Sequence, residues 1–202
     1  MDIDATWESV LLRRGVVLEV VTLAWNVIGV VVLAVAASAS GSVALVGFGF
    51  DTLIEIGAST VVVWELMGSA PNRRVVALRL IGWAFACLAA YLTVQSVWAL
   101  ATQHHASRAA LGIVWTAVTA GVMFALAAGK ARTGARLDYP VLRTEGRVTF
   151  IDGVLACVVL GGLVIDDRWA WWWADPAVGL VVAGYAAREA WTILRGDGAG
   201  TS

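Results

Sequence analysis

The sequence predicts an all-α, polytopic membrane protein with six transmembrane helices. Its 202 residues are 60% hydrophobic and only 14% charged, which is far more apolar than a typical soluble domain. Several apolar runs reach the roughly 18–20 residues that a helix needs to cross a bilayer. A soluble core of this size cannot bury so much apolar surface, so we expect the chain to lie in lipid.

The first three spans are delimited by polar or basic residues. A span at 15–37 follows a pair of arginines; it is too long for a cleaved signal and contains Glu19 and Asn26, so we expect a retained helix. A second span, 43–66, ends before the basic stretch PNRR, and a third, 75–99, follows that stretch.

The remaining three spans are delimited in the same way. A span at 109–129 ends at the basic stretch GKARTGAR, and the next, 142–165, is the least apolar of the six. The last, 174–194, follows a tryptophan cluster. We therefore expect a cytoplasmic N-terminal segment, a six-helix membrane domain and a flexible tail, with no appended soluble domain. Their expected limits are 1–14, 15–195 and 196–202.

Arginine and lysine residues mark alternate connections between the spans. They precede the first span, lie between the second and third and between the fourth and fifth, and follow the sixth. The other three connections hold only Arg108 and Arg168. Because basic residues favour the cytoplasmic side, both termini are predicted to be cytoplasmic. The tryptophan cluster at 169–173 is expected to form an aromatic belt at the outer face.

Acidic residues lie inside the second and fifth spans, where a carboxylate is costly unless it faces protein or water. Asp51 and Glu55, in the stretch GFGFDTLIEI, are four residues apart and share a helix face, as do Glu145 and Asp152, seven apart. With a rise of about 1.5 Å per residue, Glu55 and Asp152 lie about 15 and 16 Å from the cytoplasmic boundary, and Glu145 lies nearer to it. The two helices are therefore predicted to share a carboxylate site near the bilayer centre.

Each acid also has a structural interpretation. A salt bridge with Arg143 or Arg147 explains Glu145 equally well. For Asp51, Glu55 and Asp152, the alternative is that the carboxyl groups are protonated and hydrogen-bonded to the backbone or to Ser59 and Thr60. No equally deep Arg, Lys or His is apparent for them, so a shared site is favoured over three coincidences. Clustered carboxylates bind a metal cation or carry protons, and an exchanger uses both because metal binding displaces protons.

These residues resemble the membrane domain of the cation diffusion facilitator, or cation efflux, family. The second span is similar to the family's Asp-x-x-x-Asp motif, which reads Asp51-x-x-x-Glu55 here, and Asp152 falls on the metal-ligand acid of the fifth span. Asp175 and Pro176 match the entry to the sixth span and are interpreted as structural. The resemblance covers most of the chain and implies a short prokaryotic member with only the six-helix membrane domain.

The sequence departs from the zinc-binding pattern of that family. Zinc members usually carry His-x-x-x-Asp in the fifth span, and Val148 occupies the His position. The chain's only histidines, His104 and His105, lie in an outer loop and are expected to be solvated. An oxygen-only site lacks the imidazole that suits zinc and favours a harder cation such as manganese or iron(II). The implied metal ligands are Asp51, Glu55, Asp152 and Glu145.

The resemblance implies proton-coupled antiport of a divalent metal cation by alternating access. Zinc is the first candidate for the transported ion because of the family resemblance, and manganese, iron or cobalt are candidates because of the ligand chemistry. Close helix approach at Gly47, Gly49 and Gly57 would assist the movement. The implied partners are the lipid bilayer, protons, the transported cation and a second copy of the chain in a homodimer. Neither an organic cofactor nor nucleic-acid binding is expected.

Two other classes of function compete with transport. A membrane scaffold or regulator with a degenerate metal site is suggested by the missing His, and a metal-flux assay distinguishes it from a transporter. An intramembrane enzyme is disfavoured because a serine protease needs a His base inside the membrane and neither His is embedded. We therefore predict a multi-pass protein of the cell (inner or plasma) membrane without catalytic residues.

Overall fold

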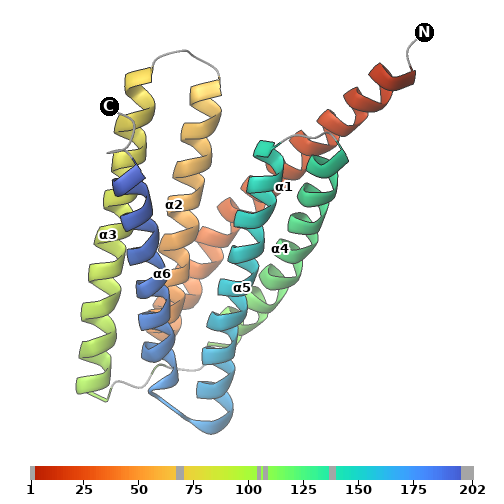
Figure 1. The fold of residues 1–202 in the computed structure, drawn as a ribbon. Coiled ribbons are helices and arrows are strands. Elements are labelled where there is room, and N and C mark those ends of the chain that lie inside the picture. Colours follow the sequence, from red (N-terminus) through yellow and green to blue (C-terminus); the bar gives the residue numbers. More distant parts are fainter. Residues whose placement is uncertain (1–2, 67–70, 104–105, 107–108, 137–139, 197–202) are drawn as a thin grey trace.

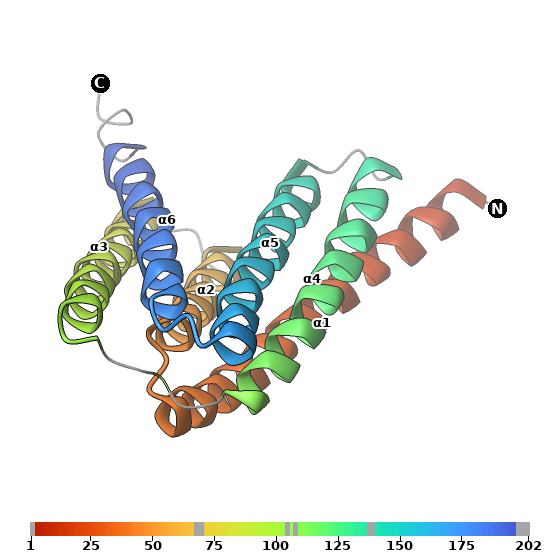
Figure 2. The same cartoon turned by 90° about the horizontal axis from the view of Figure 1, so that it is seen from below.

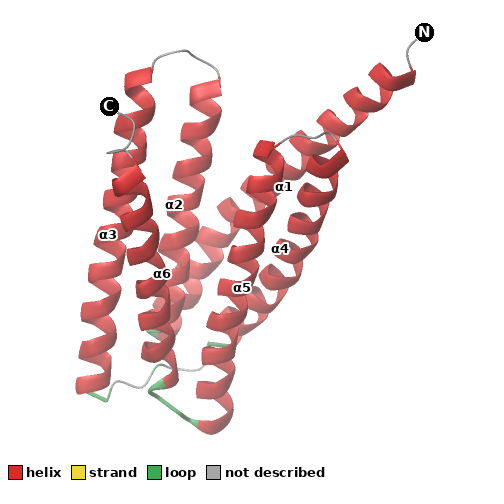
Figure 3. Cartoon of the chain, in the orientation of Figure 1, coloured by secondary structure: helices red, strands yellow, loops and turns green. Residues whose placement is uncertain are grey.

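The computed structural model contains six α-helices, which confirms the predicted all-α class (Figure 1). They are α1 (Ile3–Ser40), α2 (Val43–Leu66), α3 (Pro71–Ala101), α4 (Ala110–Arg136), α5 (Pro140–Trp169) and α6 (Ala174–Gly196). The structure describes residues 3–66, 71–103, 106, 109–136 and 140–196, without the side chains of 3–9, 12, 58–66, 71–78, 140, 141, 143–145 and 196. These residues include no strand (Figure 3).

Several helices extend beyond the predicted spans. The first begins at Ile3 instead of residue 15, and α4 continues to Arg136 instead of ending at 129. Hydropathy marks only the part of a helix that suits lipid, whereas backbone hydrogen bonding continues until a helix breaker intervenes. Pro71 and Pro140 are the first residues of α3 and α5, where proline is tolerated because its missing N–H needs no partner.

The helices are long and apolar enough for a membrane protein. Among the described residues, five stretches qualify as candidate membrane spans: Arg13–Ser40, Arg79–Ala101, Ala110–Arg136, Gly146–Trp169 and Ala174–Arg195. The remaining helix, α2, has 24 residues, and at about 1.5 Å per residue this length also exceeds a hydrocarbon core of about 30 Å. Its side chains are described only as far as Gly57.

The helices form two groups, which Figure 2 shows from below. In one group α3 packs against α6 and both contact α2; in the other, α4 packs against α5 and α1 lies against α4. The core that joins them includes Leu33, Leu45, Leu92, Val159 and Val182, all of them buried. The contact between α2 and α5 is much less extensive than the contact between α4 and α5.

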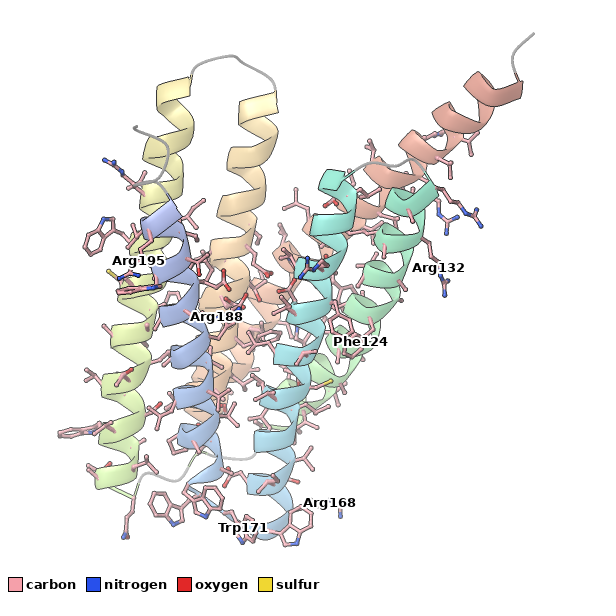
Figure 4. All side chains as sticks on the ribbon, in the orientation of Figure 1. Phe124, Arg132, Arg168, Trp171, Arg188 and Arg195 are labelled. Atoms are coloured by element: carbon pink, nitrogen blue, oxygen red, sulfur yellow. The ribbon has the colours of Figure 1, made fainter. Side chains whose placement is uncertain are left out.

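The start of α1 and the end of α6 lie at the end of the bundle where α2 and α4 finish and α3 and α5 begin (Figure 1). Arg132 and Arg195 lie toward this end, whereas Arg168 and Trp171 lie at the opposite end (Figure 4). There, Trp171 stacks on Trp173 with ring centroids 5.4 Å apart, and both rings are about half exposed. This placement of aromatic and basic side chains is the one expected of membrane interfaces.

The three glycines singled out in α2 have different surroundings. A Cβ added to Gly47 would lie 2.9 Å from Leu92 Cδ1 of α3 and 3.3 Å from Val182 Cγ1 of α6. A Cβ at Gly49 would meet α1 only at an ordinary 3.4 Å, and one at Gly57 would meet none of the described residues within 4 Å. Close helix approach is therefore confirmed at Gly47 and is not found at Gly57 among the described residues.

Asp175, in the first turn of α6, ties that helix to the start of α2. Its carboxylate accepts hydrogen bonds from the Ser42 hydroxyl and, at 2.8 Å, from the backbone N–H of Val43. The second bond satisfies one of the N–H groups that every helix leaves open in its first turn. The structure therefore agrees with the structural role expected of Asp175.

We predict that Asp175→Ala destabilises the protein by about 1–3 kcal/mol, because it removes a buried cap and leaves the Ser42 hydroxyl unsatisfied. Asp175→Asn retains one acceptor oxygen and should lose less. The measurement is the unfolding midpoint of the purified protein in detergent. Asp167→Ala, on an exposed side chain of α5, is the control. Equal midpoints for Asp175→Ala and the control would contradict the capping role.

Candidate metal-binding site

Three of the predicted acids come together between α2 and α5. Asp51 of α2 is 2% exposed and Asp152 of α5 is 7% exposed, while Glu55 is half-buried. The Glu55 and Asp152 carboxyl groups are joined by a side-chain hydrogen bond, and Asp51 is close enough to interact electrostatically with Asp152. Two helices that are distant in sequence thus bring their acids to one place.

Asp51 has an unmet hydrogen-bonding requirement. Its Oδ1 atom is buried and makes no hydrogen bond to any described residue. A buried acceptor without a partner is costly, and in native proteins such an atom usually indicates a functional role or an absent ligand. This oxygen is therefore suited to accept a cation or a proton.

Neighbouring helices complete the surroundings of the acids. The side-chain amide of Asn26 on α1 donates to Glu55 Oε2 at 3.4 Å. Glu55 and Asp152 line a small pocket, part of which is open to the surroundings. The other lining residues are Trp25, Asn26, Gly29, Leu33, Phe48, Thr52, Trp115, Thr119 and Met123.

A pair of tryptophans forms an apolar wall of this pocket. Trp25 of α1 stacks on Trp115 of α4 with ring centroids 4.9 Å apart and ring planes 8° apart. The Trp25 Nε1–H donates to the Thr119 hydroxyl at 3.2 Å, which fixes the orientation of the stack. The wall lowers the local polarity, so charges beside it interact more strongly than they would in water.

A close contact between α4 and α5 fixes the backbone beside Asp152. A Cβ added to Gly153 would lie 2.9 Å from Cε1 of Phe124, the α4 residue labelled in Figure 4. Only glycine allows the phenyl ring to lie this close to the α5 backbone. The ring therefore holds the helix segment that carries the acid.

Of the other predicted site positions, only Val148 and Thr149 have side chains that the structure describes. Glu145 lies in α5, but its side chain is outside the described residues, as are His104 and His105. Val148, where the resemblance places a histidine, is 41% exposed, while Thr149 beside it is buried. Among the described residues, no three His, Cys, Asp or Glu side chains are arranged closely enough to hold a metal ion.

Sequence reasoning missed a basic residue near the acids. Lys130 was assigned to a connection, but it lies in α4 and is 1% exposed, and its Nζ is 2.9 Å from Glu19 Oε2 of α1. Lys130 also acts electrostatically on Glu55, an interaction that the sequence did not indicate. The stretch GKARTGAR contains no proline, and that absence could have indicated that the helix continues.

Two residues of α6 were also missed. Tyr185 and Glu189 are half-buried, and both interact electrostatically with Asp51. They are four residues apart and therefore occupy the same face of α6. That spacing was the available signal, but without a known position for α6 it did not link them to the acids of α2.

A multi-pass helical bundle with carboxylates gathered in its interior defines a membrane protein that handles cations, because acids in a membrane usually mark ion or proton pathways. The comparison with protein families agrees with this class. Residues 75–198, more than half of the chain, match the cation efflux transmembrane domain. The chain belongs to the cation efflux family, whose activity is cation transport and not enzymatic catalysis.

The family match extends from α3 to the end of α6 and includes Asp152. Asp51 and Glu55 precede the matched residues, so their place in the site depends on the geometry alone. No curated protein matches the chain.

Proposed function

We propose that this protein is a proton-coupled efflux antiporter for divalent metal cations. We assign the transported ion to Asp51, Glu55 and Asp152. The observation that carries the proposal is the meeting of Glu55 and Asp152 inside the bundle, with Asp51 close by. Up to three carboxylates in a place with few compensating cations attract a divalent ion strongly, because the low dielectric strengthens the interaction.

The contact between Glu55 and Asp152 supports proton coupling. Two carboxylates this close in a low-dielectric interior repel each other, and a proton or a divalent cation between them relieves that repulsion. A metal ion that binds both groups must displace that proton. In the exchange cycle, metal binding from one side therefore releases protons, and proton return from the other side releases the metal.

The donor chemistry favours hard cations. All three acids are oxygen ligands, and the side chain of Asn26, which contacts Glu55, carries a carbonyl oxygen that is also hard. Carboxylate and carbonyl oxygens suit manganese and iron(II) better than thiolate-preferring ions. Zinc and cobalt should also be tested as substrates, zinc because the family resemblance makes it the first candidate. Glu145, on α5 toward the end where α1 starts, is proposed to lie at the mouth of the site.

Alternating access requires the two ligand-bearing helices to move relative to each other. The limited contact between α2 and α5 supports such movement, because little packing is lost when the helices separate. The basic residues at the end where α1 starts support a cytoplasmic location for that end. We further propose that residues 15–195 form the membrane domain and that two copies associate within the membrane.

The proposal predicts metal uptake into proteoliposomes that depends on a proton gradient. Flux of zinc, manganese, iron(II), cobalt and cadmium should be measured at two pH values. Apparent affinity should be lower at the more acidic pH, because protons and metal compete for the same carboxylates. Empty liposomes provide the background. Absence of flux with every ion would instead indicate a scaffold or regulator with a degenerate site.

A further inference from the structure

The ion pair of Lys130 and Glu19 lies where three helices meet. Lys130 is 1% exposed, and its Nζ lies 2.9 Å from Glu19 Oε2, whose side chain is 41% exposed. A Cβ added to Gly146 would lie only 3.3 Å from Lys130 Cβ, so α5 closes over the lysine from another side. A buried ammonium is tolerated only when a partner compensates its lost hydration, and Glu19 provides that partner.

The position of this pair relates it to the carboxylate site. Gly146 precedes Asp152 by six residues, which is about 9 Å along α5. On α1, Glu19 precedes Asn26 by two helical turns, and Asn26 donates a hydrogen bond to Glu55. The Lys130 charge also acts on Glu55. A positive charge is thus fixed about two turns from the acids, toward the end where α1 starts.

We propose that the positive charge of Lys130 offsets part of the negative charge of the transport site and thereby lowers the affinity of the site for the divalent ion. This inference rests on the proposed function. A conducting site must bind its ion well enough to admit it and weakly enough to release it. Carboxylates gathered in a low-dielectric interior attract a divalent cation strongly, and the fixed ammonium offsets part of their attraction.

Glu19 is proposed as the positioning residue for this charge. Lysine carries its ammonium on a flexible four-carbon stem, so the charge stays in place only when a partner holds it. Neutralising Glu19 would remove the negative charge that compensates the ammonium and leave its full positive charge acting on Glu55. The two members of the pair should therefore have opposite effects on metal binding, which a purely structural ion pair would not produce.

The test is equilibrium binding of Mn²⁺ and Zn²⁺ to the purified full-length protein in lipid nanodiscs. Lys130→Met should bind metal about tenfold more tightly, because a unit positive charge about 10 Å away has been removed. Glu19→Gln should bind more weakly than the wild type. Lys130→Arg, which keeps the charge, should bind with an affinity close to that of the wild type.

A double variant separates the proposal from a loss of folding. Glu19→Gln combined with Lys130→Met removes both charges of the pair, and it should bind metal more tightly than Glu19→Gln alone because the ammonium is gone. Unchanged affinity in Lys130→Met relative to the wild type, or in the double variant relative to Glu19→Gln, would overturn the role of Lys130 alone, provided that Asp152→Asn still weakens binding. Binding that is insensitive to Asp152→Asn would overturn both this inference and the proposed function.

Discussion

Asp152→Asn is expected to reduce metal transport by on the order of a hundredfold while leaving a folded protein. The amide has nearly the shape of the carboxylate, so packing of this 7% exposed side chain should be preserved. What is lost is a unit negative charge in direct contact with a divalent ion, which at an effective dielectric of about 20 amounts to several kcal/mol. The measurement is metal flux into proteoliposomes, with the unfolding midpoint recorded in parallel.

Asp51→Asn should have a similar effect, because Asp51 is 2% exposed and has an oxygen without a partner among the described residues. A matched control is Asp167→Asn, which makes the same chemical change on an exposed side chain of α5. If both Asp51→Asn and Asp152→Asn transported metal as fast as Asp167→Asn, the proposed site would be wrong.

Gly47→Leu is expected to impair folding and transport together. The first added atom would lie 2.9 Å from Leu92 Cδ1, and the remaining atoms have no space between α2, α3 and α6. Overpacking of this kind typically costs about 1–3 kcal/mol, and it would also shift the helix that carries Asp51 and Glu55. Purified yield, thermal midpoint and metal flux should all fall.

Gly57→Leu provides the control in the same helix, because none of the described residues lies within 4 Å of a Cβ at that position. The two variants share the same intrinsic change in helix propensity, so any difference between them arises from packing. Equal midpoints for the two variants would show that the close approach at Gly47 does not limit stability.

The number of helices and the pairing of the acids were predictable because both depend on local regularities. Apolar length counts the spans, and the helical repeat places Asp51 and Glu55 on one face. The depth argument then related Glu55 to Asp152 from helix rise alone, and the structure joins these two side chains.

The surroundings of the acids were not predictable, because they depend on how helices pack. The Trp25–Trp115 stack joins residues 90 positions apart in the chain, and no local pattern indicates it. Lys130 was missed for a different reason: hydropathy ends a span at the first charge, although the helix itself continues to Arg136. Buried charges are therefore most easily overlooked near predicted span ends.

The Asp175 bridge has a mechanical consequence for the proposed transport cycle. Because that carboxylate joins the start of α6 to Ser42 and Val43, one end of α2 should move together with α6. Asp152 lies on α5, whose backbone is contacted beside it by Phe124 of α4. A movement of α2 and α6 away from α4 and α5 would separate the two acids of α2 from Asp152, so the step that opens a path would also release the metal ion.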